Sequence, residues 1–134
     1  MDPWNILNEV KAIGLNSLEA KALAPEGSRW FAGHFPGEPI LPGIAMMQAV
    51  YSAIREDAVA RGEEVGLSSL RRVRFTSPVR PGDQLNVSLN REVMEQDMVY
   101  IFKVAVKDSV VCSGMMTVVK AAQKIKVKKE DGDA

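Results

Sequence analysis

The stretch Gly33-His34-Phe35-Pro36-Gly37-Glu38-Pro39-Ile40-Leu41-Pro42-Gly43 is the most constrained part of this 134-residue chain. It holds the only histidine of the chain, three of its seven prolines and three of its ten glycines. Proline fixes φ and glycine permits positive φ, so this composition predicts a loop with a defined backbone. His34 supplies that loop with a side chain that can accept and release a proton near neutral pH.

The residues after this loop predict a long buried helix. Pro42 suits a first helical turn, where its missing N–H is not needed. From Gly43 to Ile54 the run is apolar on nearly every side, and Gln48 is its only large polar side chain in the first turns. A helix that is apolar all round belongs in a protein interior. Charged residues follow Ile54, so we expect the helix to emerge into water there.

The chain before the loop predicts one short helix and one strand. Apolar residues recur at every third position between Asp2 and Ile13, namely Trp4, Leu7, Val10 and Ile13. This spacing is typical of one face of an amphipathic helix. Leu18 to Leu23 alternates apolar residues with charged or small ones, which predicts a strand.

The chain after Leu67 predicts four antiparallel strands, at residues 70–79, 85–90, 99–106 and 110–119. Leu85, Val87 and Leu89 alternate with polar residues, as in a half-buried strand. Turn residues separate the first two runs at 81–83, and a hairpin turn joins the last two at 107–109. The mostly charged tail from about residue 123 is expected to be disordered.

This order of elements predicts an α+β fold in a single domain, residues 1–134, with a curved antiparallel sheet wrapped around one buried helix. A second subunit is expected to cover what one sheet cannot. The formal net charge is zero, which argues against binding to nucleic acid or to an anionic membrane. One cysteine, Cys112, excludes an internal disulfide, and no signal peptide or membrane span is apparent, so we expect a cytoplasmic protein.

Two motifs resemble the signatures of a known family. Gly33 to Pro39 followed by Leu41-Pro42-Gly43 resembles the first signature of the FabZ/FabA-like β-hydroxyacyl-[acyl carrier protein] dehydratases, which have the hot dog fold. Val73-Arg74-Phe75, with Pro78-Val79 and residues 81–85, resembles the second. The resemblance runs from about Leu18 to about Val119 and implies a lyase that forms trans-2-enoyl thioesters in fatty acid or related lipid biosynthesis.

The resemblance also implies roles for individual residues. His34 would remove the C2 proton of a 3-hydroxyacyl thioester, and the backbone N–H near Gly43 would hold the thioester carbonyl. The acyl group would arrive on the phosphopantetheine arm of acyl carrier protein, with no other cofactor and no metal. The dimer, or a trimer of dimers, would share the site between subunits. The residues implied in binding the substrate are Phe35, Pro36, Pro42, Ile44 and Met47.

Gln48 departs from the family pattern. The family places an acidic residue fourteen positions after the histidine, and a carboxamide has no proton to give near pH 7. An enzyme of reduced activity is therefore the first hypothesis. A thioesterase of the same fold, and a non-catalytic acyl-binding subunit paired with an active paralogue, remain open. Gln48 could also be a buried amide satisfied by backbone groups.

Two further features allow a structural and a functional interpretation. Arg71, Arg72, Arg74 and Arg80 form a basic set that is most often a solvated strand face, although it could contact the acidic carrier protein. Cys112 lies in an apolar run and is expected to be inert.

Overall fold

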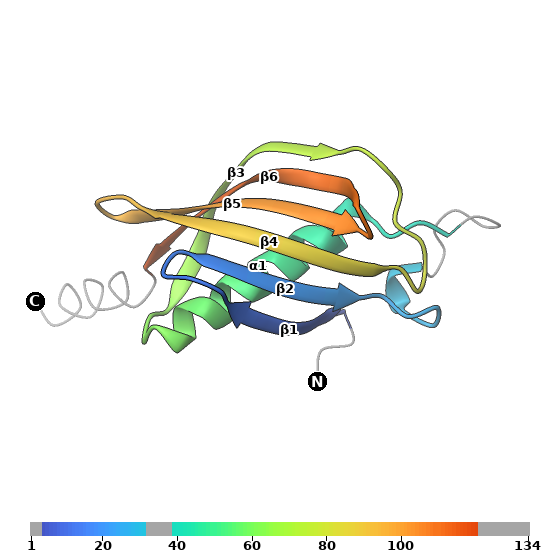
Figure 1. Cartoon of the computed structure of the whole chain (residues 1–134), viewed down its shortest axis with the longest axis horizontal. Coiled ribbons are helices and arrows are strands. Elements are labelled where there is room, and N and C mark those ends of the chain that lie inside the picture. Colours follow the sequence, from blue (N-terminus) through green and yellow to red (C-terminus); the bar gives the residue numbers. More distant parts are fainter. Residues whose placement is uncertain (1–3, 32–38, 121–134) are drawn as a thin grey trace, which may run out of the picture.

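The structure is a computed structural model that describes residues 4–31 and 39–120. In these ranges it contains six strands, one long helix and one 3-10 turn. They are β1 (Leu7–Ala12), β2 (Ser17–Leu23), η1 (Arg29–Phe31), α1 (Gly43–Ala60), β3 (Val65–Phe75), β4 (Gln84–Val93), β5 (Asp97–Val106) and β6 (Ser109–Lys120). The strands form one sheet in the order β1-β2-β4-β5-β6-β3, and every neighbouring pair is antiparallel (Figure 1).

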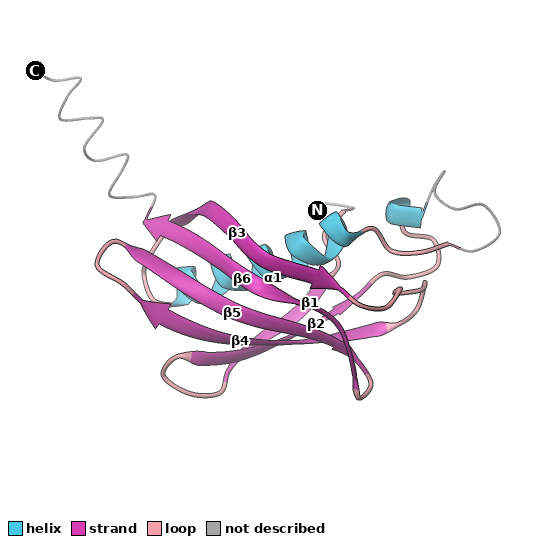
Figure 2. Ribbon diagram, turned by 90° about the horizontal axis from the view of Figure 1, so that it is seen from above, coloured by secondary structure: helices cyan, strands magenta, loops and turns pink. Residues whose placement is uncertain are grey.

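The sheet curves around α1, which lies along its concave face (Figure 2). Alternate residues of the central strands point at the helix, and burying their apolar side chains is the main stabilising term of such a core. The inward residues include Leu85, Val87 and Leu89 of β4, as the alternation predicts. The α+β fold with a curved sheet and one long helix is therefore confirmed.

Within the described chain the helix is buried on one side only, and the second subunit that is expected to cover its other side stays a prediction. Its sheet-facing side includes Val50, Ala53 and Ile54, all fully buried. On the opposite side Ile44 is 60% exposed, Val59 is 70% exposed, and Gln48 lies between them and is also exposed. Exposed apolar side chains on this side of the helix are consistent with the second subunit that the sequence analysis expects.

The N-terminal segment forms an edge strand, so the predicted helix over residues 2–13 is wrong where the structure describes it. The pairing of β1 with β2 shifts register between Leu7 and Glu9. This bulge adds one residue, so Leu7 and Val10 pair with Ala22 and Ala20, which face the core. A spacing of three in this segment therefore reflects a bulged strand and not a helical face.

The other edge strand, β3, has a second bulge that sets the direction of its last residues. Arg71 pairs with Met115 and Arg74 pairs with Ser113, so three steps along β3 match two along β6. Arg72 lies within this shift and has a left-handed φ of 53°. The extra residue places Arg71 and Arg74 on the outer face and turns Phe75 inward, toward α1.

Three other predictions concern the ends of these elements. The strand predicted over 70–79 begins earlier, at Val65, and ends at Phe75, before Pro78. The hairpin between β5 and β6 is confirmed. The charged tail from residue 123 lies outside the described residues. Among the described residues, no helix is both long and apolar enough to cross a membrane.

Candidate active site at the start of the helix

Two backbone donors at the first turn of α1 are unpaired within residues 4–31 and 39–120. Pro42 precedes the helix in an extended conformation, and its carbonyl accepts a hydrogen bond from the N–H of Ala45 at 3.0 Å. The N–H groups of Gly43 and Ile44 have no hydrogen-bond partner among the described residues. Such groups, together with the positive end of the helix dipole, favour an oxygen that carries negative charge.

The ring of Phe75 lies directly against Gly43. A Cβ atom added at Gly43 would come within 2.6 Å of Cζ of Phe75, which is closer than real Cβ atoms approach. Any larger residue at position 43 would therefore displace the ring of Phe75, which is half exposed at 50%. The ring forms an apolar wall beside the free N–H groups.

The two sequence signatures meet in space beside this wall. The N–H of Leu41 donates to the carbonyl oxygen of Val79 at 2.7 Å, which ties the residues before α1 to the connection after β3. Gly82 N–H donates to the carbonyl of Ala24 at 2.9 Å, which adds the end of β2 to the same region. Leu41, Val79 and Ala24 are all buried, so this junction is a fixed part of the core.

The structure places the remaining predicted site residues in different surroundings. Gln48 lies one helical turn after Ile44, and both point away from the sheet of their own chain. Pro42 is half-buried beside the helix start, whereas Met47 packs into the core with 6% exposure. The predictions for His34, Phe35 and Pro36 lie outside the described residues.

A tryptophan pair lies just before the loop and was not singled out from the sequence. The indole N–H of Trp30 donates to the carbonyl oxygen of Trp4 at 2.6 Å. Their rings meet edge to face with centroids 4.8 Å apart. The pair ties the N-terminal segment to η1, the turn that leads into residues 32–38. The available signal was that the chain contains only these two tryptophans.

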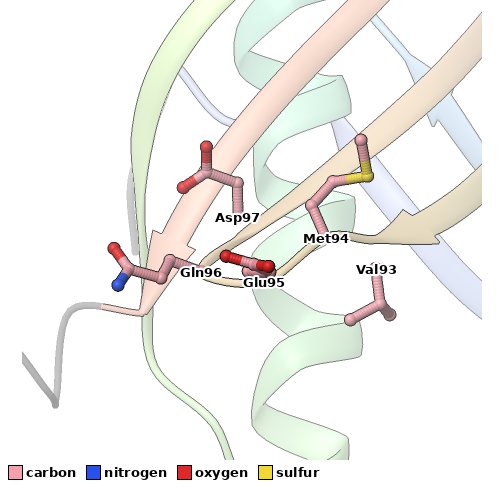
Figure 3. A pocket seen from close by; sticks show the side chains of 5 residues that line it. All are labelled: Val93, Met94, Glu95, Gln96 and Asp97. Carbon is pink, nitrogen blue, oxygen red and sulfur yellow. The ribbon is translucent and has the colours of Figure 1, made fainter.

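A surface hollow of about 620 Å³ lies at the turn between β4 and β5 and is lined by residues 93–97 (Figure 3). Its lining is one run of consecutive residues, so it has a single wall. The labelled side chains in Figure 3 spread apart and do not converge on a common point. This arrangement does not form a ligand site.

The opposite end of α1 is closed by a buried polar network. Asp57 is 7% exposed and accepts hydrogen bonds from the Tyr100 hydroxyl at 3.0 Å and from Nε of Arg61 at 2.9 Å. Burial, followed by the nearby charge and hydrogen bond of Asp57, raises the pKa of Tyr100 to about 12. Arg61 also donates to the carbonyl of Leu15 at 2.8 Å, which joins the helix to the β1–β2 turn. These contacts anchor the C-terminal end of the helix.

Comparison with known proteins identifies the family. A family model described as ApeI dehydratase matches residues 11–115, well over half of the chain. The 3-hydroxyacyl-[acyl-carrier-protein] dehydratase FabZ of Levilactobacillus brevis is 30% identical over 103 residues, which cover 73% of this chain and 70% of that protein. FabZ of Syntrophobacter fumaroxidans is 42% identical over 65 residues, and that match spans 45% of this chain and 44% of the relative's length.

Solved structures of low sequence identity share the fold. The dehydratase heterocomplex ApeI:P from Xenorhabdus doucetiae superposes with a TM-score of 0.68 at 23% identity, covering 90% of this chain and 100% of that one. A thioesterase from Haemophilus influenzae gives a TM-score of 0.64 at 16% identity, with 83% and 76% covered. Both likenesses establish the hot dog fold alone. By its family match and its FabZ relatives, the chain belongs to the ApeI-like dehydratases of the FabZ/FabA-like group, which have the hot dog fold.

Proposed function

We propose that this protein dehydrates 3-hydroxyacyl thioesters carried on acyl carrier protein and forms trans-2-enoyl thioesters for fatty acid or related lipid biosynthesis. The observation that carries the proposal is the start of α1. There, two N–H groups without a hydrogen-bond partner among the described residues lie beside the half-exposed ring of Phe75, shortly after His34 in the sequence. Free donors at a helix start suit a thioester carbonyl that gains negative charge as the C2 proton leaves.

The proposed reaction uses His34 as base and then as acid. The imidazole takes the proton from C2, and the N–H of Gly43 stabilises the enolate oxygen of the thioester. The C2–H electron pair forms the C2=C3 bond as the C3–O bond breaks. The hydroxyl leaves as water after accepting the proton back from the imidazolium of His34. Every atom is then accounted for without an additional cofactor.

Gln48 is proposed to hold the departing hydroxyl of a substrate bound mainly to a second subunit. Its side chain is exposed on the helix face that points away from its own sheet, beside the exposed Ile44. A hydrogen bond from the carboxamide can orient the hydroxyl but cannot protonate it. Loss of a positioned acid costs about 10²–10⁴-fold in rate, so the native enzyme is expected to be slow.

The test is turnover of a 3-hydroxyacyl carrier-protein thioester by the native protein and three variants. Gln48→Glu restores a proton donor and is expected to raise the rate by about 10²-fold or more. Gln48→Met keeps the size and removes the hydrogen bond, so its rate should fall below the native rate. His34→Ala should abolish turnover. Absence of turnover in both the native protein and Gln48→Glu would contradict the proposal.

A second candidate is a subunit that completes its site with an active paralogue. The observation that favours it is the amide at Gln48, because a partner chain with a carboxylate at this position would supply the missing acid. The structural neighbour from Xenorhabdus doucetiae is itself a heterocomplex of dehydratase chains. Full activity of the purified homodimer would exclude this candidate, whereas activity that appears only after mixing with a paralogue would support it.

A further inference from the structure

Three cationic side chains on the outer face of the sheet form no ion pair with the residues that the structure describes. Arg71 and Arg74 of β3 point outward after the bulge, and the register aligns Arg74 with Ser113 and Lys103 in one row across β3, β6 and β5. Ion pairs among the described residues involve four other cations, namely Lys21, Arg61, Arg91 and Lys120. Arg71, Arg74 and Lys103 are all exposed.

These cations surround an apolar centre, and together they form what we term the arginine face. The next row aligns Arg71 with Met115 and Ile101, so two apolar side chains lie among the three charges. Neighbouring strands are about 4.8 Å apart, which puts Arg74 about 10 Å from Lys103. That separation is close to the Debye length at physiological salt, so the three positive fields add. Apolar residues ringed by arginine are typical of a protein interface.

The bulge in β3 is what creates this face. In a regular strand Arg71 and Arg74 would point to opposite sides, because successive residues alternate. The extra residue, with Arg72 in the left-handed region at φ 53°, brings both to the outer side. A left-handed backbone is unfavourable for a residue other than glycine, and bulges next to active sites commonly change the direction of a side chain.

The arginine face lies next to the candidate active site. Phe75 follows Arg74 directly and packs against Gly43 on the other side of the strand. β3 ends at Phe75, so a flexible arm that passes the end of the strand reaches the start of α1. A partner held on the arginine face could therefore deliver a tethered group to the free N–H groups without entering the core.

We propose that the arginine face docks acyl carrier protein through that protein's acidic surface and the phosphodiester of its phosphopantetheine arm. This inference rests on the proposed function, because it names the surface that receives the substrate's carrier. Guanidinium groups suit carboxylate and phosphate oxygens through paired hydrogen bonds. Exposed charges at the rim of an interface act mainly on the association rate, so docking should be salt-dependent.

The test compares Arg74→Glu with Lys11→Glu, two charge reversals in the same cross-strand row. Lys11 pairs with Glu19, which aligns through Ser88 with Lys103, so it occupies the opposite edge of the same outer face. For a 3-hydroxyacyl carrier-protein substrate, Arg74→Glu should lower kcat/KM about tenfold, and Arg71→Glu/Arg74→Glu should lower it further. Lys11→Glu should remain within about twofold of the native value, since electrostatic steering depends on local charge.

A short pantetheine thioester of the same acyl group separates docking from chemistry. All three variants should use it at the native rate, and raised salt should erase the difference between native and Arg74→Glu on the carrier substrate. Equal losses on both substrates, no loss on the carrier substrate, or an equal loss in Lys11→Glu would each overturn the docking surface.

A direct binding measurement keeps this inference distinct from the proposed reaction. Fluorescence anisotropy of labelled holo-acyl carrier protein should show binding to the native protein and to Lys11→Glu, and weaker binding to the double arginine variant. If neither thioester is turned over but the carrier binds the variants as expected, the proposed reaction is wrong and the proposed docking surface is supported. If the native protein does not bind the carrier, the docking surface is wrong.

Discussion

The two ends of α1 differ in how their polar groups are paired. At the N-terminal end the N–H groups of Gly43 and Ile44 have no partner among the described residues, and the aromatic ring beside them is half exposed. At the C-terminal end Asp57 is buried and holds both Tyr100 and Arg61. Nearby, Glu63 pairs with Arg91 at 3.7 Å and with Lys120 at 3.1 Å.

This difference indicates which end of the helix is suited to bind and convert a substrate. Buried polar groups that are paired with one another hold a fold together and are shielded from a ligand in solution. One exception at the closed end is Nε of Arg91, which is buried without a partner in the described chain. At the N-terminal end, which we call the open end, the donors have no partner in the described part of the chain, and the ring of Phe75 packs closely on Gly43. We therefore expect mutations at the open end to change activity and mutations at the closed end to change stability.

Among the changes that test this comparison of the two helix ends, Gly43→Ala is expected to have the largest effect. The new Cβ would overlap the Phe75 ring, so the ring or the helix start must move. Misplacement by about 1 Å can cost about 10²-fold in rate, and we expect a loss of that size in kcat. Gly66→Ala is the matched control, because a Cβ there meets nothing within 4 Å. Steady-state kinetics should show that the double variant Gly43→Ala/Phe75→Ala partly recovers kcat. If the effects of the two changes on kcat are simply additive, the steric explanation is wrong.

Asp57→Ala should destabilise the fold at the C-terminal end of α1. Removing the carboxylate leaves the buried Tyr100 hydroxyl and Arg61 without their shared acceptor, which should cost about 3 kcal/mol of unfolding free energy. Asp57 lies about 21 Å from Gly43 along the helix, so kcat should stay within roughly twofold. Urea denaturation measures the first quantity. The exposed neighbour Glu56→Ala should change stability by less than about 0.5 kcal/mol, and a large loss of kcat in folded Asp57→Ala would contradict the separation of the two ends.

Tyr100→Phe tests the C-terminal end of the helix through the pH dependence of the unfolding free energy. The pKa of Tyr100 is raised to about 12 from an ordinary 10.0, so the folded protein holds this proton more tightly than the unfolded chain. Its contribution is complete below pH 10 and is lost as pH rises toward 12. Unfolding free energies measured from pH 9 to 12 should therefore fall less steeply in Tyr100→Phe. Tyr51→Phe, a half-buried hydroxyl deletion on the helix, should keep the native slope.

The smallest effect concerns Cys112, which pairs across strands with Phe75 at the open end. Burial raises the pKa of its thiol to about 11, so little thiolate is available near pH 8. Alkylation by iodoacetamide should be slow in the native protein and fast after unfolding. If Gly43→Ala displaces the Phe75 ring, alkylation should accelerate in that variant and not in Asp57→Ala. Rapid alkylation of the native protein would mean that the core behind Phe75 is open.

The central strands could be predicted from the sequence because their environment is regular. In β4, a neighbour on each side and one buried face enforce strict alternation, which Leu85, Val87 and Leu89 display. The edge strands have a neighbour on one side only, so their alternation is less strictly enforced. Bulges in β1 and β3 change the spacing of inward residues from two to three, so a helix was predicted around Leu7 and Val10, and the outward direction of both Arg71 and Arg74 was not foreseen.

The candidate site divides in the same way. The constrained loop, the start of the helix at Gly43 and the departure at Gln48 are all visible in the sequence. Two contacts join segments that are more than thirty residues apart. They are the packing of Phe75 on Gly43 and the backbone hydrogen bond from Leu41 to Val79. No local pattern indicates them, because each depends on the path of the whole sheet.

By itself the sequence determined the kind of elements, where the helix begins and which side chains lie near its start, since propensity, proline and glycine chemistry and periodicity act over a few residues. The tertiary structure decided the register of the two edge strands, the exposure of one side of α1 and which end of the helix has its polar groups paired within the described chain. The physical reason is that these features are set by pairing between distant strands and by the close approach of one side chain to a glycine, and neither is encoded in neighbouring residues.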